Sequence, residues 1–495
     1  LGPWMTAFAY GTSYFSAVIF IGYAGQFGWN YGLSSTWIGI GNALLGSLLA
    51  WVVLGNRTRV MTKYLGVSTM PEFFEKRYNS KALKTASALI VFLFLIPYTA
   101  SVYNGLSTLF ASAFPGIPYS VWIVIMAAFT AVYVILGGYM ATAVNDFLQG
   151  IVMLIGIAAV VICAVNTQGG LGNVISQLGQ IDSGSAYGTY TSILGPDPLN
   201  LIGVVILTSL GTWGLPQMVQ KFYAIKDKAA VRRGSLISTL FAVIVAGGSY
   251  FLGGLGRLYC TTDAAENGKT LIHTVANGEP NFDSIVPAIL ESAIPEILLG
   301  LVIVLVLSAS MSTLAGLVLS SSSTMTIDLI KPCMKKGMSQ KKQVLTMRIL
   351  IIVFLLISVW IAVDKQRLND IGINISALMS ISWGTLAGSF LAPFLYGLFS
   401  KKVTKAAVWV SLCSGVLITV VSMILFNLDI FPELSRSAAG FTVFGLNFNL
   451  ASPINWGTIA MIVGLIEVPI ISMLSATKAS TEYASKIFEC YHTEE

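Results

Sequence analysis

Twelve apolar runs, each long enough to cross a lipid bilayer, leave this chain few options other than a bundle of membrane-spanning helices. A spanning helix needs about 20 mainly apolar residues. Only 10% of the 495 residues are charged and the mean hydropathy is +0.79, whereas a soluble domain has about 25% charged residues. The sequence therefore predicts an all-α polytopic membrane protein in a lipid bilayer, with spans near residues 5–28, 33–55, 81–112, 118–137, 143–166, 199–220, 231–256, 294–326, 345–364, 371–398, 404–426 and 454–476.

The distribution of Lys and Arg predicts how the chain is oriented. Short cytoplasmic loops of membrane proteins carry an excess of these residues. Here 23 of the 28 Lys and Arg fall in the loops after the second, sixth, eighth and tenth runs and in the C-terminal tail. This asymmetry predicts a multi-pass protein of the cell membrane, with both ends of this chain in the cytoplasm.

The cysteines and histidines argue against several classes of protein. The five cysteines, scattered from Cys163 to Cys490, have no metal or redox spacing. The two histidines, His273 and His492, lie outside the apolar runs. We find no catalytic constellation within the bilayer, so the sequence predicts that the protein is not an enzyme. We also expect no nucleic-acid partner.

Two of the predicted spans are interrupted. The first contains "GTSYFS", in which Gly11 and several hydroxyl side chains stand where lipid favours leucine. The sixth contains "GTWGLPQ", where glycines ease unwinding and Pro216 removes a backbone donor. A pair of interrupted segments at corresponding positions of two halves indicates a transporter built from inverted repeats.

The eighth span carries a hydroxyl-rich stretch, "LSASMSTLAGLVLSSSSTMTIDL". Ser308, Ser312 and Ala315 share one helical face, with Thr313 beside it. Such a face suits tight helix packing or a hard cation, which takes several oxygen ligands. Carbonyls of an unwound segment and an adjacent Ser/Thr pair would together replace much of the water shell of a sodium ion, without a carboxylate.

Few charged residues lie within the predicted spans, where such residues indicate function. Asp146 begins the fifth span. It is either an interfacial acid at a helix N-terminus, where the helix dipole favours a negative charge, or a coupling acid of transport. We interpret Glu467, in the last span, as structural or snorkelling.

The chain resembles the sodium:solute symporter family, which includes the bacterial sodium/proline and sodium/pantothenate symporters. The resemblance runs from about Gly2 to beyond Leu398 and rests on "LGPWMTAFAYGTSYFSA", "IGYAGQFGWNYGL", "VYVILGGYMATAVNDFLQGIVMLIG", "GLPQMVQKFYAIKDKAAVRRG" and "LSASMSTLAGLVLSSSSTMTIDL". It implies a LeuT-type fold with two inverted five-helix repeats, two peripheral helices and a cytoplasmic tail, over residues 1–166, 199–398, 404–476 and 477–495. Family members carry one more helix before the repeats, so we expect a segment to precede Leu1.

The resemblance also implies a sodium site. Its ligands would be the backbone carbonyls of Thr12, Phe15 and Ala309 and the hydroxyls of Ser312 and Thr313. In the family's sialic acid symporter, a second sodium uses an acid that matches Asp146, together with hydroxyls at positions that are Ala315 and Gly316 here. We therefore expect one sodium ion per cycle.

Family position places the solute between the breaks of the first and sixth helices. The residues expected to face it are Tyr14, Ser16, Asn42, Tyr98, Trp213 and Gln217, with core packing as an equal alternative for the aromatic residues. Proline symporters carry an aspartate where this chain has Tyr14. No Lys or Arg is expected inside the first, third, sixth or tenth helix, which argues against sialic acid. The candidate solutes that remain are small zwitterions such as proline, vitamins such as pantothenate, and short monocarboxylates.

The sequence thus predicts a sodium-coupled symporter that moves a small organic solute into the cell by alternating access, with a monomer as its functional unit. Sodium would join the first helix to the eighth and complete the solute site, so that coupling is a reciprocal difference in affinity between states. A proton-coupled carrier that uses Asp146, and a solute sensor on the same fold, are the alternatives.

Overall fold

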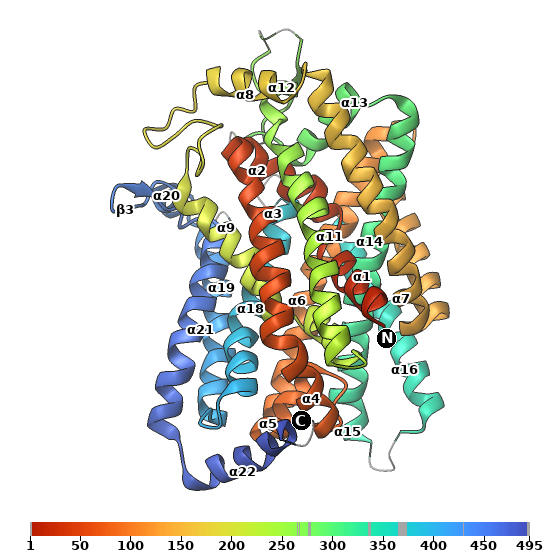
Figure 1. The fold of residues 1–495 in the computed structure, drawn as a ribbon, viewed down its shortest axis with the longest axis vertical. Helices are drawn as coiled ribbons and strands as arrows, with labels where there is room; N and C mark the ends of the chain where they lie inside the picture. The colour runs from red at the N-terminus through yellow and green to blue at the C-terminus, as the bar shows by residue number, and fades with distance from the viewer. Residues whose placement is uncertain are drawn as a thin grey trace.

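The protein is a bundle of long helices that run roughly along its longest axis (Figure 1). The computed structural model describes residues 2–264, 266, 268–275, 279–334, 338–364, 374–428 and 430–492, apart from the side chains of residues 14 and 138–143. Its first half contains α1 (Pro3–Tyr14), η1 (Val18–Tyr23), α2 (Ala24–Tyr31), η2 (Gly32–Ser35), α3 (Thr36–Gly41), η3 (Asn42–Leu49), η4 (Trp51–Gly55), α4 (Asn56–Leu65), α5 (Met70–Tyr78), α6 (Lys81–Ala113), α7 (Tyr119–Thr167), α8 (Leu171–Gln180), α9 (Pro198–Leu210), η5 (Gly211–Gly214), α10 (Pro216–Tyr223) and α11 (Lys228–Gly254).

The second half continues with further helices and four short strands. These are α12 (Gly256–Tyr259), β1 (Cys260–Thr261), β2 (Thr270–Leu271), η6 (Phe282–Ser284), α13 (Ile285–Ala293), α14 (Glu296–Thr324), η7 (Met325–Ile330), α15 (Lys331–Cys333), α16 (Gln340–Val363), α18 (Ile375–Phe399), α19 (Lys405–Phe426), α20 (Pro432–Ala439), β3 (Thr442–Val443), β4 (Leu446–Asn447), α21 (Pro453–Ser475), α22 (Lys478–Phe488) and η8 (Glu489–Tyr491). Strands β1 and β2 pair in parallel, and β3 and β4 pair antiparallel.

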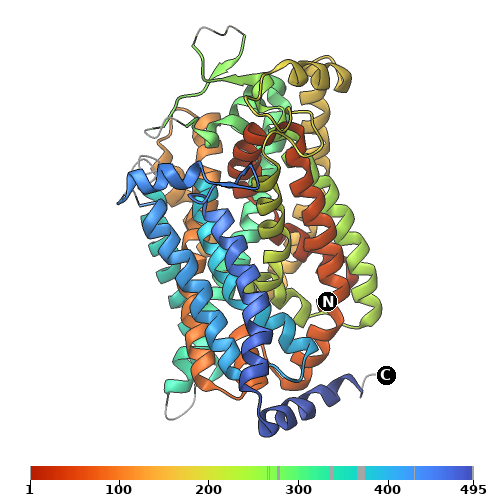
Figure 2. The same ribbon diagram turned by 90° about the vertical axis from the view of Figure 1, so that its left-hand side faces the viewer.

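Different helices lie at the two ends of the bundle (Figure 1). We call the end with α4, α5 and α22 the basic side, and the end with α8, α12 and α13 the loop side (Figure 1). Helix α22 runs across the basic side, and α19 and α21 stand at the edge of the bundle (Figure 2). Behind them, the apolar stretch of α18 is completely buried, so this helix forms part of the core.

The first 65 residues cross the bundle twice, in opposite directions. Residues 11, 28, 39 and 55 approach residues 241, 253, 247 and 231 of α11, in that order. The point of contact therefore moves toward the C-terminal end of α11 up to residue 28, and then returns toward its N-terminal end. The chain turns at Gly32, whose φ of +60° is in the region that glycine enters without strain.

The number of spans differs from the sequence prediction. Among the described residues, ten helices are long and apolar enough to cross a membrane, or eleven if the bent pair α9–η5 and α10 counts as one span. The sequence predicted twelve. The difference arises because residues 18–65 count as one helical stretch, although that stretch contains the turn at Gly32. Residues 371–373, at the start of the predicted run 371–398, lie outside the described residues.

The predicted break in the first span is confirmed. Helix α1 ends at Tyr14, and Phe15 is extended, with φ −105° and ψ 130°. The amide of Val18 then donates to the hydroxyl of Ser16 (3.3 Å), which caps the next helical segment. The carbonyls at the end of α1 consequently have no partner further along the same helix.

The predicted break in the sixth span is confirmed as well. Helix α9 ends at Leu210, a single 3₁₀ turn follows, and Leu215 is extended with φ −83° and ψ 119°. Pro216 then occupies the first position of α10, where its missing N–H costs nothing. The two halves of this span meet at an angle of 48°.

Candidate functional site

The break in α1 lies against the hydroxyl-rich stretch of α14. The hydroxyl oxygen of Thr313 is 3.1 Å from the carbonyl oxygen of Phe15 and 3.5 Å from that of Thr12. Within α14, the same oxygen is 3.2 Å from the carbonyl oxygen of Ala309. The hydroxyl of Ser312 donates to the hydroxyl of Thr12 at 3.0 Å. The structure therefore brings the five predicted sodium-ligand residues together, although they lie about 300 positions apart in the sequence.

These oxygens are fixed in place by the surrounding backbone. The hydroxyl of Thr12 donates to the carbonyl of Phe8 (2.8 Å), which orients the last turn of α1. The hydroxyl of Ser310 accepts from the amide of Ala17 (2.9 Å), which ties α14 to the residues after the break. All five predicted ligand residues are buried. The site is thus made of neutral oxygens from buried residues.

Neutral carbonyl and hydroxyl oxygens are ligands for a hard cation rather than for a transition metal. No group of three or more His, Cys, Asp or Glu residues that could hold a metal occurs in the described parts of the chain. The residues present therefore fit a sodium ion.

A second group of predicted residues lies near the middle of the bundle. Asn42 accepts hydrogen bonds from Thr208 and Ser209 of α9 through its Oδ1 atom (2.9 and 3.1 Å), while its Nδ2 atom has no hydrogen-bond partner among the described residues. The Tyr98 hydroxyl also lacks one there, although Ser16 lies nearby. Buried polar groups without partners are rare in proteins, so these atoms mark a place where a polar ligand would fit.

Sequence reasoning missed one further residue of this group. Tyr250 of α11 lies near Asn42 and Tyr98, and its hydroxyl has no hydrogen-bond partner in the part of the chain that the structure describes. It follows Ser249 in an otherwise apolar stretch, and packing contacts between helices use polar residues as well.

Two of the predicted solute contacts belong to residues at the breaks of the two interrupted spans. The indole nitrogen of Trp213 donates to the carbonyl of Leu45 (3.0 Å), so this side chain joins η5 to η3. For Tyr14, the side chain lies outside the described residues, and only its backbone, at the end of α1, is placed.

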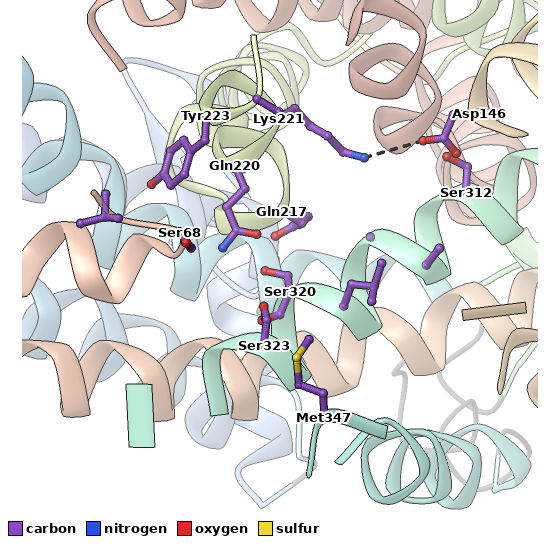
Figure 3. Close-up of a pocket in the computed structure, with 15 residues that line it drawn as sticks. Ser68, Asp146, Gln217, Gln220, Lys221, Tyr223, Ser312, Ser320, Ser323 and Met347 are labelled. Atoms are coloured by element: carbon purple, nitrogen blue, oxygen red, sulfur yellow. Dashed lines mark hydrogen bonds and ion pairs between the residues drawn. The ribbon is translucent and has the colours of Figure 1, made fainter. Parts of the chain in front are cut away.

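Gln217 lines a cavity of about 440 Å³ on the basic side (Figure 3). Neither polar atom of its side-chain amide has a hydrogen-bond partner among the described residues, and the same holds for Nε2 of Gln220 and Oγ of Ser320. The cavity extends from Ser312 toward the connection between α4 and α5. It leads from the predicted sodium ligands to the basic side.

Asp146 also lines this cavity and pairs with Lys221. This pair contradicts the prediction that the sixth helix contains no Lys or Arg. The Nζ atom of Lys221, in α10, lies 3.7 Å from Oδ2 of Asp146, and both side chains are buried. The sequence predicted no Lys or Arg inside the sixth helix, because its expected run ended at residue 220. Lys84 corrects the same expectation for the third helix: it is buried near the start of α6 and pairs with Glu75 (2.8 Å).

Comparison with known proteins identifies the chain's relatives. The family model described as "Sodium:solute symporter family" matches residues 1–415. The chain belongs to the sodium:solute symporter family. A sodium/proline symporter of Staphylococcus aureus is 29% identical over 439 residues, which cover 85% of this chain and 78% of the relative. The corresponding protein of S. aureus strain JH9 matches equally well.

Solved structures of other symporters share the fold. A substrate-bound, outward-open Na⁺-coupled sialic acid symporter has a TM-score of 0.66 at 18% identity, and the match covers 96% of this chain and 90% of the symporter chain. Mhp1, a nucleobase-cation-symport-1 family transporter, has a TM-score of 0.54 at 14% identity, and the match covers 98% of this chain and 96% of the Mhp1 chain. The fold is the LeuT type that the sequence predicted. The activity of this family member is sodium-coupled symport, and sodium is its coupling ion.

Proposed function

We propose that the coupling sodium ion binds to the carbonyl oxygens of Thr12, Phe15 and Ala309 and the hydroxyls of Ser312 and Thr313. The observation that carries this proposal is the convergence of these residues at the break of α1. An ion there joins α1 to α14. Because this joint adjoins the solute region around Ser16, sodium and solute each favour the arrangement that binds the other.

The solute that we propose is a small zwitterion, with proline as the first candidate. The name of the S. aureus relatives supports this choice. The unpartnered atoms of Asn42, Tyr98 and Tyr250 are an amide and two hydroxyls, which bind polar groups without carrying a full charge. The charged ends of a zwitterion would then meet peptide groups at the broken helix ends. Pantothenate-like vitamins and short monocarboxylates are the alternative solutes.

We further propose that the basic side faces the cytoplasm, in accordance with the positive-inside rule. Both ends of this chain would then be cytoplasmic, and the cavity below Ser312 would be the route by which solute and sodium enter the cell. In this proposal, residues 1–166 and 199–398 form the two repeats and 404–476 the peripheral helices. A single copy of the chain is the functional unit.

Proton coupling through Asp146 is the second candidate mechanism. Its carboxylate already lies beside the ammonium group of Lys221. A carboxylate that is neutralised by a fixed cation is poorly suited to take up and release a proton in each cycle. This contact favours sodium over protons as the driving ion.

Thermal unfolding of the purified protein tests the proposal. Proline, pantothenate, short monocarboxylates and sugars are each added in sodium and in potassium buffer. A ligand that binds the folded state raises the unfolding temperature, and we expect proline to do so only when sodium is present. Stabilisation by a sugar alone, or by proline equally in potassium, would contradict the proposal.

A further inference from the structure

An ion pair from two other helices lies beside the predicted sodium ligand Ser312. Asp146 belongs to α7 and Lys221 to α10, and their charged groups approach to 3.7 Å. Figure 3 shows the Lys221 side chain reaching across the cavity to Asp146, with Ser312 beside the carboxyl group. Of the described residues that line this cavity, these two alone carry a charge.

The burial of Asp146 requires a cation nearby. Its side chain is only 2% exposed, and that of Lys221 only 9%. A buried carboxylate without a partner is strongly destabilising, and it would attract any small cation that reached it. The cavity gives such cations a route, because it connects Asp146 with the basic side.

A second sodium ion at Asp146 would compete with Lys221 for the carboxylate. On α14, the next residues that face the cavity after Ser312 are Ala315 and Gly316, which have no side-chain oxygen. The ammonium group brings its own three donors and needs no further oxygen ligands. It is also tethered to α10, so it is present at a high effective concentration whatever the sodium concentration is.

Ser312 links this ion pair to the proposed sodium site. Its hydroxyl now donates to Thr12 at 3.0 Å. A hydroxyl that binds a cation presents a lone pair to the ion and turns its hydrogen away. Oδ1 of Asp146 has no hydrogen-bond partner among the described residues, so it is the acceptor that can receive this hydrogen.

We propose that Lys221 is a tethered cation that takes the place of a second sodium ion at Asp146, and so sets the stoichiometry at one sodium per solute. The inference rests on the proposed sodium site. Lys221 neutralises Asp146 but stays with the protein, so a cycle with a zwitterionic solute carries one net positive charge. With Lys221 as its partner, Asp146 remains available to orient Ser312.

Equilibrium binding of radioactive sodium to the purified protein, without solute, tests this role. We expect one ion per wild-type molecule and two per molecule of Lys221→Met, in which the carboxylate has lost its cation. Lys221→Arg keeps the charge and should bind one. The double variant Lys221→Met/Asp146→Asn removes both charges and should return to one. Lys226→Met, which removes an exposed lysine three residues after α10, is the matched control and should also bind one.

The outcomes separate this inference from the function on which it rests. One ion bound by folded Lys221→Met would overturn the inference while leaving the sodium site intact. Two ions bound by the wild type would overturn it without any variant, which covers the case in which Lys221→Met does not fold. No binding by the wild type, or binding that survives Ser312→Ala combined with Thr313→Ala, would refute the proposed sodium site and this inference together.

Discussion

The hydroxyl oxygen of Thr313 lies 3.1 Å from the carbonyl oxygen of Phe15, across a separation of 298 residues in the chain. This hydroxyl has a single hydrogen, yet three carbonyl oxygens lie within 3.5 Å of it. Acceptors therefore outnumber donors at the break of α1. A bound cation satisfies such an excess of oxygen acceptors.

Replacing Thr313 or Ser312 by alanine should weaken sodium binding. Each change removes one oxygen ligand of a desolvated cation, and a loss of about 1.4 kcal/mol corresponds to a tenfold change in affinity. We expect the sodium concentration for half-maximal uptake to rise about tenfold or more, with the amount of protein in the membrane unchanged. Ser308→Ala, on the same helix but outside the ligand set, is the control. An unchanged sodium dependence in both ligand variants would rule out this site.

Tyr98→Phe should weaken solute binding selectively. The change removes a buried hydroxyl that has no hydrogen-bond partner among the described residues. The loss of a hydrogen bond to a ligand costs roughly 1–3 kcal/mol, so the solute dissociation constant should rise about 5- to 150-fold. Sodium binding without solute should stay the same. Tyr396→Phe is the control, because that hydroxyl donates to the carbonyl of Leu465 (2.9 Å), and an equal effect in both variants would contradict the assignment.

Gly28→Ala should destabilise the fold. An added Cβ atom would lie 1.9 Å from the carbonyl carbon of Gly253, which is backbone and cannot rotate away. Overpacking of this kind costs about 1–3 kcal/mol or more. The thermal midpoint and the yield of monodisperse protein should both fall. Gly300→Ala, with no atom within 4 Å of the added methyl group, should leave them unchanged, and a stable Gly28→Ala protein would show that these helices do not touch.

Asp197, which precedes α9, should make stability depend on pH. Burial raises the pKa of its carboxyl above the ordinary 3.8, although hydrogen bonds from Asn200 and Asn447 partly oppose the shift. Because the folded pKa is the higher one, this group favours folding below pH 3.8, and the contribution is lost as pH rises through the folded pKa. Asp197→Asn should therefore gain stability relative to the wild type as pH rises from about 4. A constant difference in thermal midpoint across this range would contradict the expectation.

The sequence indicated the two breaks because helix-breaking and polar residues stand out within apolar runs. The hydroxyls around Thr12 and Thr313 suggested a cation site or tight helix packing, and the individual sodium ligands were predicted from the resemblance to the family. Helical phase is harder to read near a break. Trp213, which is expected to face the solute, lies within the 3₁₀ turn itself, and its indole donates to the carbonyl of Leu45 in a distant segment.

Residues whose role depends on distant partners could not be predicted in this way. Lys221 lies one residue beyond the expected end of the sixth span, so it was grouped with the loop lysines. Its burial becomes apparent only when α10 packs near Asp146. Tyr250 lies in an otherwise apolar stretch of α11, and nothing in its immediate sequence separates a solute contact from a packing contact.

The glycine contacts between α2 and α11 divide the first span into two parts with different freedom of movement. Gly28 and Gly253 touch backbone to backbone, so those two segments have little room to shift against each other. By contrast, α1 meets α11 through the rings of Phe8 and Phe241, whose centroids are 5.6 Å apart, and rings can slide and repack. Phe15 is therefore the natural hinge of this span. An ion held by the proposed carbonyl ligands at that hinge would set the angle of the joint.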